Sequence, residues 1–571
     1  YRAAYPDWWT DGFGSAARET AASRKTHSDM TAVEGLLSMA VLKDKCLPQA
    51  THQQIEHIHE SLLFYDEHTF GASESVSDPL CENSQVQWGE KSAYAWEAVK
   101  RTQMLYETSV GLLQGDLRRG KNPTLTIFNT LNWKRSEMLT VYIDFEVIPR
   151  NQFFEITDFQ GHSLKVQPIR YRREGCYYAI FAEDIPPMGY KTFEIVFKQP
   201  STDTGTITIN NASIENHFYK LQLNPDKGTI QSLYDKELNC ELVDSSSPWE
   251  LGAFIYEKLG NRDQLAQYRL DDYNRTGLSE CRIIDSSNGP IYQRILLQGK
   301  SPGTDEAFGV NLEIKLYHDT KRIELEYAIK RLPETDPSGI YVAFPFQLPE
   351  GKLAFDVQGG TVISGKNQLE GTSTDWNTVQ NFVSVQNNQA QIIIGSSLIP
   401  LYQLGDINLG KFQYQKQYER PHVYSWVMNN YWNTNFKASQ EGEFRWSYHL
   451  TSSVDPSNNL ATKFGWSSRI PLYARVMPTG TENHKPTEYS AFHFEKDNFL
   501  MTSCTPSKEE GYILLNIREI DGKRTNLRIL NEDGQTIPFT IVNAIEEKLE
   551  NETSEHIFEG YQNKFIKIKR F

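Results

Sequence analysis

Apolar residues in the first part of the chain recur with the spacing of α-helices. The positions that show this spacing best are Met30, Val33, Leu36, Leu37, Ala40 and Val41. They repeat every three or four residues, which predicts a helix of about 25 residues that ends near Lys45. Similar patterns predict a shorter helix over 51–63 and a third over 88–116, with Trp96 on its apolar stripe. Three helices with facing apolar stripes predict a bundle over 1–117.

A long acidic segment at 64–87 separates the second and third predicted helices. It contains five Asp or Glu residues and no Lys or Arg. Ordered loops of this length are uncommon unless they serve a function. We therefore expect a functional loop, and the alternative is an acidic loop that only increases solubility.

After Asp116 the pattern changes to alternating apolar and polar residues. Examples are the runs at 124–131 and 139–145, which are bounded by Pro, Gly and Asn. This alternation is typical of strands in antiparallel sandwiches. The predicted units are a small β-sandwich at 118–198, a linker at 199–205, a large β-sandwich at 206–455 and a β-domain at 460–571. The predicted fold class is α+β and mainly β, with a three-helix bundle before antiparallel β-sandwich domains.

Composition narrows the range of partners. The chain has 571 residues, which predicts several domains, and a formal net charge of −15. An acidic surface repels phosphate, so we expect neither nucleic acid nor an anionic membrane as a partner. Apolar runs stay well short of the roughly 18 residues of a membrane span. Aromatic residues make up 12% of the chain, which favours β-structure, sugar-stacking surfaces, or both.

The start of the chain is unusual for a natural N-terminus. Aromatic residues are dense from the first position, namely Tyr1, Tyr5, Trp8, Trp9 and Phe13. Natural N-termini are generally polar and loosely ordered. We therefore expect that a preceding piece has been removed.

Five short motifs follow one another along the chain. They are PDWWTDG at 6–12, DEHTFGA at 66–72, FNTLNW at 128–133, a segment from ENHF to GTIQSLYD at 215–235, and NNYWNTN at 429–435. Together these motifs resemble glycoside hydrolase family 38, the α-mannosidases. The resemblance extends over nearly the whole chain with its order kept, so it is more specific than any single motif.

The resemblance implies an order of domains, and it implies which domain carries the catalytic residues. In that family an α/β barrel precedes the helical bundle and the β-domains, which include a mutarotase-like supersandwich. The aspartate nucleophile and the His-x-Asp metal ligands lie in the barrel. We therefore expect no catalytic residue in this chain, and we expect the chain alone to be inactive.

The resemblance also implies a metal ligand in the 66–72 motif. His68 matches best, and Asp66 is the runner-up because the order of acid and histidine differs from that of the eukaryotic members. The divalent ion would be zinc, with calcium as the alternative. An imidazole among carboxylates suits such an ion, which would orient two sugar hydroxyls. Asp66 and Glu67 would accept hydrogen bonds from the sugar, and Trp9 would offer a face to its C–H groups.

Each candidate also has a purely structural explanation. A histidine in an acidic loop is usually solvated, and tryptophans usually serve packing, which is the role expected of Trp8. His57 and His59 lie two residues apart and face different ways on a helix, so we expect a solvated helix face. For Arg518 we expect a surface position on a strand. Turn chemistry explains the amides of 429–435 as well as a sugar site does.

The predicted function is that of part of a retaining α-mannosidase-type hydrolase acting on mannosyl glycans. The alternative is a non-catalytic carbohydrate-binding or scaffold protein. A third option, another glycosidase family with a mutarotase-like sandwich, is disfavoured by the helical bundle. The sequence allows two protein partners, a second copy of the chain and the barrel domain. It does not determine the cellular compartment.

Overall fold

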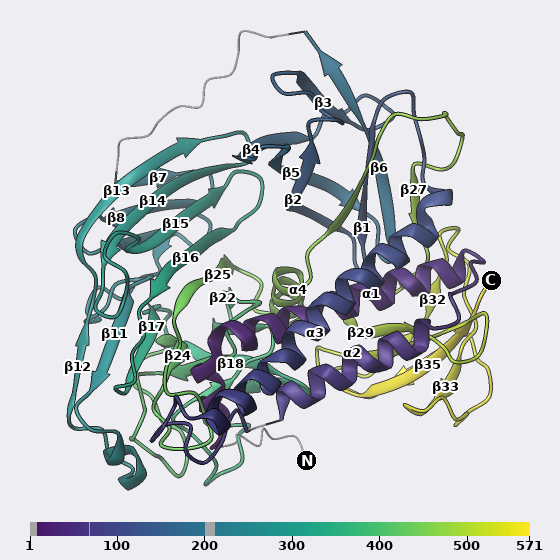
Figure 1. The fold of residues 1–571 in the computed structure, drawn as a ribbon. Helices are drawn as coiled ribbons and strands as arrows, with labels where there is room; N and C mark the ends of the chain where they lie inside the picture. The colour runs from purple at the N-terminus through teal and green to yellow at the C-terminus, as the bar shows by residue number, and fades with distance from the viewer. Residues whose placement is uncertain (1–7, 68, 200–211) are drawn as a thin grey trace.

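The computed structural model describes residues 8–67, 69–199 and 212–571. It confirms the predicted fold class, because helices at the N-terminal end are followed by antiparallel sheets. Figure 1 shows the helices crossing between a large teal and green sandwich, a small blue sandwich and a yellow C-terminal part. The predicted linker at 199–205 lies outside the described residues except for Gln199.

The bundle has three long helices and short 3-10 helices at its ends. The elements are η1 (Thr10–Ala16), α1 (Ala17–Leu42), α2 (Thr51–Asp66), α3 (Glu82–Leu113) and η2 (Gln114–Asp116). The loop between α2 and α3 covers 67–81 and is shorter than the predicted 64–87. One reason is the N-cap of α3, where the Cys81 sulfur accepts a hydrogen bond from the Ser84 amide.

Helix α1 is buried along most of its length because it has neighbours on two sides. Met30, Val33 and Leu37 pack with α2 and α3, whereas Leu36 and Met39 pack with the C-terminal β-structure. An α-helix covered on two faces cannot show a clean apolar stripe. The helix therefore joins the bundle to the rest of the molecule.

The small sandwich is completed by strands from the far end of the chain. One sheet contains β26 (Tyr473–Met477), β1 (Thr124–Asn129), β6 (Gly189–Lys198), β27 (Glu488–Ser490) and β3 (Phe153–Thr157). The other contains β2 (Arg135–Asp144), β5 (Gly175–Ile185) and β4 (Lys165–Tyr171). The predicted domain at 460–571 is therefore not one unit, since β26 pairs with β1 and β27 with β6.

The large sandwich contains three antiparallel sheets. The nine-stranded sheet has the order β13 (Ser279–Asn288), β14 (Tyr292–Lys300), β15 (Val310–Tyr317), β16 (Ile323–Arg331), β25 (Gly442–Ser453), β22 (Gln391–Gly395), β21 (Phe382–Gln386), β18 (Lys352–Val357) and β19 (Gly360–Ile363). The six-stranded sheet has the order β12 (Tyr273–Thr276), β11 (Phe254–Leu259), β17 (Ser338–Phe344), β24 (Val423–Asn429), β23 (Leu401–Leu404) and β20 (Asn377–Thr378). The four-stranded sheet has the order β10 (Cys240–Glu241), β9 (Thr229–Asp235), β8 (Tyr219–Asn224) and β7 (Ser213–Glu215).

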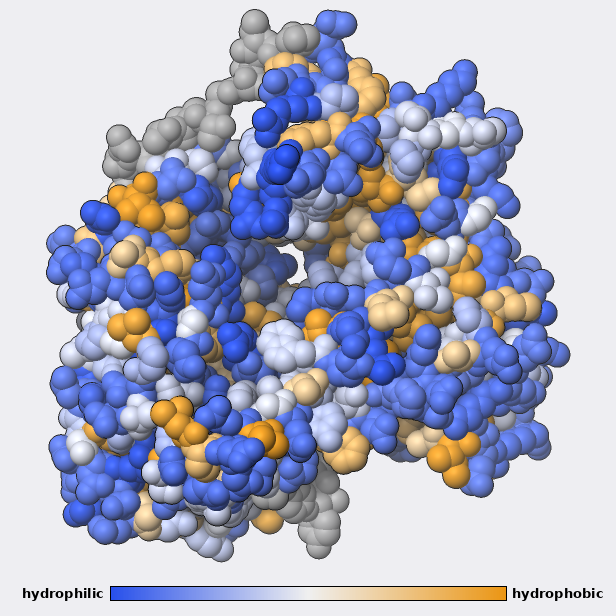
Figure 2. Space-filling model, viewed as in Figure 1, coloured by the Kyte–Doolittle hydropathy of each residue, from blue (hydrophilic) through white to orange (hydrophobic). Residues whose placement is uncertain are grey.

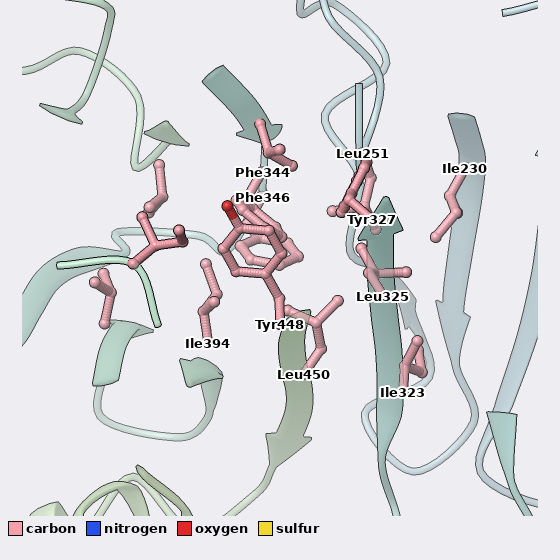
Figure 3. Close-up of a cluster of buried hydrophobic side chains, with 14 of the residues drawn as sticks. Ile230, Leu251, Ile323, Leu325, Tyr327, Phe344, Phe346, Ile394, Tyr448 and Leu450 are labelled. Carbon is pink, nitrogen blue, oxygen red and sulfur yellow. The ribbon is translucent and has the colours of Figure 1, made fainter. Parts of the chain in front are cut away.

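Side chains of all three sheets fill one core. Ile323, Leu325 and Tyr327 occupy alternate positions of β16 and therefore point the same way (Figure 3). They pack with Phe344 of the six-stranded sheet and Ile230 of the four-stranded sheet. The two-residue period read from the sequence reflects this burial.

The end of the chain forms a helix and smaller sheets. Helix α4 (Asn458–Arg469), which the sequence pattern did not predict, begins where Ser457 Oγ accepts a 3.2 Å hydrogen bond from the Leu460 amide. The main sheet contains β29 (Phe499–Pro506), β30 (Tyr512–Glu519), β35 (Asn563–Lys569) and β33 (Thr540–Val542). Two short pairs join β28 (His493–Phe494) to β32 (Ile529–Leu530) and β31 (Thr525–Leu527) to β34 (His556–Phe558).

The molecular surface is mainly hydrophilic. Figure 2 shows apolar residues scattered in small groups over this face, and an opening between the small sandwich and the large one. Among the described helices, none combines the length and the apolar character needed to cross a membrane.

Candidate functional site

The 3-10 helix η1 is fixed to the large sandwich by side-chain hydrogen bonds. Asn429, the last residue of β24, donates from Nδ2 to the Asp11 carbonyl at 2.9 Å. The indole Nε1 of Trp376 donates to Thr10 Oγ1, also at 2.9 Å. A Cβ atom at Gly12 would lie 2.6 Å from Cδ1 of Phe436, so only glycine fits at this point. The 6–12 motif thus contains residues that fix η1 to the large sandwich.

Trp9 and Trp8, which are adjacent in sequence, have different surroundings. Trp9 stacks on Trp432 with ring centroids 4.7 Å apart and remains 40% exposed. Trp8 packs edge-on against Trp376 and Tyr268, each at 5.8 Å between centroids. Trp8 is therefore a packing residue, whereas the ring of Trp9 is partly exposed at the surface. The contact of Trp9 with a sugar stays a prediction.

The 66–72 motif lies beside the loop that follows β24. The Phe70 amide donates to the Asn435 carbonyl and Thr434 Oγ1 donates to the Ser73 carbonyl, both at 2.9 Å. Figure 1 shows the start of α1, the end of α2 and the start of α3 at the same end of the bundle, next to the loops of the large sandwich. Folding therefore joins three motifs that are far apart in the sequence.

The predicted acidic residues bond to the helices of the bundle. Oδ1 of Asp66 accepts from Ser23 Oγ at 3.0 Å, and its Oδ2 lies 2.8 Å from His27 Nε2. Lys91 Nζ lies 3.2 Å from Glu67 Oε2 and donates to the Glu67 carbonyl at 2.7 Å. Asp66 and Glu67 are thus directed toward α1 and α3. His68 lies outside the described residues.

A complete metal site is not formed by the part of the chain that the structure describes. Within residues 8–67, 69–199 and 212–571, no three His, Cys, Asp or Glu side chains are grouped as a metal ion requires. Both carboxylate oxygens of Asp66 already have protein partners. Ligation of a metal ion by His68 or Asp66 therefore stays a prediction.

A pocket of about 320 Å³ lies beside Trp9. We call it the Trp8 pocket. Its aromatic walls are Trp8, Trp9, Tyr268, Trp376, Tyr431 and Trp432. They come from the two residues before η1, from the residue after the 3-10 helix η3 (Arg262–Gln267), from the residue before β20 and from the loop after β24. Its position beside Trp9 makes it the candidate binding pocket of this face.

Two buried carboxyl groups line the Trp8 pocket. Asp11 is 6% exposed, its Oδ1 accepts from Trp432 Nε1 at 2.9 Å, and burial raises its pKa to about 7. Asp375 is 2% exposed, its Oδ2 accepts from the Gly410 amide at 2.9 Å, and burial raises its pKa to about 6. The charge of Asp375 also raises the pKa of Asp11. Carboxyl groups with shifted pKa values in a pocket are typical of functional sites.

Sequence reasoning did not select the polar residues of this pocket. Asp11 lies within the 6–12 motif and Trp432 within the 429–435 motif, and this membership is the signal by which the sequence could have identified them. Asp375 and Arg262 carry no pattern, because they belong to two short segments, the residues before β20 and the start of η3, that only the fold brings together at the pocket.

The remaining candidates lie elsewhere. His57 is exposed as expected, whereas His59 Nε2 lies 2.6 Å from Glu34 Oε1, which raises the pKa of His59. The surface position predicted for Arg518 is wrong. It is 5% exposed, because β30 packs near β18 of the large sandwich, where Arg518 Nη2 lies 3.7 Å from Asp356 Oδ1.

Comparisons with known proteins agree with this arrangement. Residues 7–113 match the alpha mannosidase middle domain, and residues 214–412 match the C-terminal domain of glycosyl hydrolases family 38. An alpha-mannosidase from Enterococcus faecalis V583 superimposes with a TM-score of 0.74 at 13% identity, over 99% of this chain and 69% of that one. A glycosyl hydrolase family 38 protein from Enterococcus faecalis gives 0.73 at 14% identity, over 98% and 71%.

At these identities the two structures establish the fold alone. No curated protein matches the chain. The two domain matches follow each other in the order that the motifs predict, and the superpositions extend over both domains. The chain therefore belongs to glycoside hydrolase family 38, of which it carries the middle and C-terminal domains.

Proposed function

We propose that this chain is part of a retaining, metal-dependent α-mannosidase that acts on α-linked mannose in glycans. The observation that carries the proposal is the junction of three family motifs on one face. There the 66–72 segment bonds to the loop after β24, on which Trp9 stacks. One structure with the same fold is described as an alpha-mannosidase, which supports the choice of mannose.

In the proposed reaction two successive displacements occur at the anomeric carbon. A carboxylate first displaces the aglycone alcohol, which takes a proton as it leaves, and water then displaces the carboxylate with release of a proton. The two carboxyl groups must stand about 5 Å apart for this sequence. We assign the nucleophile to a barrel domain of the kind that the family resemblance implies, so the present chain would be inactive alone.

Three residues of this chain have supporting roles in this proposal. Trp9 would hold the apolar face of a sugar ring, since its other face is covered by Trp432. His68 is the proposed ligand of a zinc or calcium ion, which would supply charge at the sugar hydroxyls. Asp66, held by Ser23 and His27, would keep the start of the loop in place.

A direct test compares the 571-residue chain with the intact natural gene product. With 4-nitrophenyl α-D-mannopyranoside we expect turnover by the natural product and none by the chain. Proton NMR of the first sugar released should show the α-anomer. The β-mannoside serves as the control substrate, and chelation of the metal should abolish activity.

Three results would contradict the proposal. Turnover by the isolated chain would refute its inactivity, and release of the β-anomer would refute retention. Failure of the natural product on every α-mannoside would favour the second candidate function, a non-catalytic carbohydrate-binding protein. The aromatic Trp8 pocket is the observation that supports this second candidate.

A further inference from the structure

Several walls of the Trp8 pocket are held by contacts with one another. Trp8 meets Trp376 and Tyr268 nearly at right angles, at interplanar angles of 88° and 83°. Trp376 is further fixed by its hydrogen bond to Thr10. The pocket is therefore formed before any ligand arrives, which lowers the entropic cost of binding.

The pocket contains a buried acceptor that has no partner in the part of the chain that the structure describes. Asp375 uses Oδ2 for the Gly410 amide, whereas its buried Oδ1 accepts no hydrogen bond from any described residue. Buried polar atoms are nearly always paired, so an unpaired one calls for an explanation. A ligand hydroxyl in the pocket would supply the missing donor.

Arg262 presents the converse case, a buried donor that lacks an acceptor among the described residues. Its Nη2 donates to the carbonyls of Thr335 and Asn430, whereas its buried Nε has no partner within residues 8–67, 69–199 and 212–571. The pocket is thus lined by Asp375, whose Oδ1 could accept a hydrogen bond from a ligand, and by Arg262, whose Nε could donate one. A hydroxyl group both donates and accepts, so a polyhydroxylated ligand can satisfy both.

Size and charge restrict the ligand further. A volume of about 320 Å³ is near the lower limit of small-molecule sites and suits a single ring rather than an oligosaccharide. Asp11 and Asp375 disfavour an anion, and Arg262 disfavours a cation. Aromatic walls suit the C–H face of a sugar.

We propose that the Trp8 pocket binds one neutral pyranose ring, with a ring hydroxyl donating to Oδ1 of Asp375. The choice of mannose as that ring rests on the proposed function. Asp375 then acts as a specificity residue, because it recognises the position of a hydroxyl, whereas the tryptophans recognise only the ring face.

The test is a titration of the 571-residue chain with methyl α-D-mannopyranoside, followed by saturation-transfer NMR and tryptophan fluorescence. For a ligand of this size we expect a Kd of about 1 mM. Asp375→Asn retains an acceptor for Gly410 but presents an amide donor to the pocket, so it should weaken binding at least tenfold. Tyr268→Ala, at an exposed wall, should weaken it severalfold. Asp406→Asn, an exposed carboxylate on a neighbouring loop, should leave it unchanged.

The other outcomes separate this inference from the proposed function. Binding that Asp375→Asn leaves intact, no saturation by either methyl mannoside or methyl glucoside, or tighter binding of choline would each overturn the inference. Equal binding of both glycosides, with no mannoside hydrolysis by the natural gene product, would support a pyranose pocket but refute both mannose as its preferred ring and the mannosidase. Mannoside hydrolysis by the natural gene product, without binding of either glycoside to the 571-residue chain, would support the mannosidase and refute the pocket.

Discussion

The indole Nε1 of Trp432 donates a 2.9 Å hydrogen bond to Oδ1 of Asp11, a residue 421 positions earlier in the chain. The ring of Trp432 also supports Trp9. One side chain therefore fixes both a buried carboxyl group and the exposed aromatic platform. Several measurable consequences depend on this contact.

Replacing Trp432 by phenylalanine should destabilise the protein. The variant keeps a ring beneath Trp9 but leaves Oδ1 of Asp11 buried without its indole donor. The cost of an unsatisfied buried acceptor is about 1–3 kcal/mol. Urea unfolding followed by circular dichroism measures it. Trp466→Phe is the matched control, because the indole nitrogen of Trp466 has no partner among the described residues. Equal losses in the two variants would contradict the role assigned to this bond.

Stability should fall as pH rises toward 7, and Asp11 should contribute to the fall. Its folded pKa of about 7 lies above the ordinary value of 3.8, so the folded state holds the proton more tightly. The stabilisation of the folded state that comes from protonated Asp11 is complete at low pH and is lost as pH rises through 7. Its upper limit is about 4 kcal/mol. Asp11→Asn should therefore flatten the profile of Tm between pH 5 and 8. An unchanged slope, equal to that of Asp406→Asn, would refute this assignment.

Gly12 should not tolerate a side chain. Gly12→Ala places a methyl group against the ring of Phe436 and should cost about 1–3 kcal/mol. It should also separate η1 from the loop after β24 and change the fluorescence of Trp9. In contrast, a Cβ at Gly89 of α3 meets nothing within 4 Å. Gly89→Ala should stabilise the helix by up to about 1 kcal/mol. A harmless Gly12→Ala would show that the close approach is absent in solution.

The loop at 67–81 should become more accessible when Lys91 is removed. Lys91 Nζ donates to the carbonyls of Phe64 and Glu67, both at 2.7 Å. Lys91→Met removes these bonds, and a local loss of 1–2 kcal/mol corresponds to about 5- to 30-fold more frequent opening. Cleavage after Glu74 by a Glu-specific protease, followed by mass spectrometry, should accelerate accordingly. Lys100→Met, on the exposed side of the same helix, should leave the rate unchanged.

Local patterns in the sequence determined the helices and most strands. The three helices were predicted within a few residues because their periodicity is a property of neighbouring positions. Trp96 shows the limit of this reasoning, since it was placed on the apolar stripe of α3 and is 43% exposed. The buried side of α3 there consists of Ala95 and Ala98, because α1 packs closely against it.

Long-range contacts decided the rest. The pairing of β1 with β26 and the burial of Arg518 depend on segments that only the complete fold brings together. The sequence by itself determined the order of the domains, the family and the motif residues near the site. Only the tertiary structure decided that Asp11, Arg262 and Asp375 share one aromatic pocket, because they belong to three separate segments, namely η1, η3 and the residues before β20, whose proximity leaves no periodic trace in the sequence.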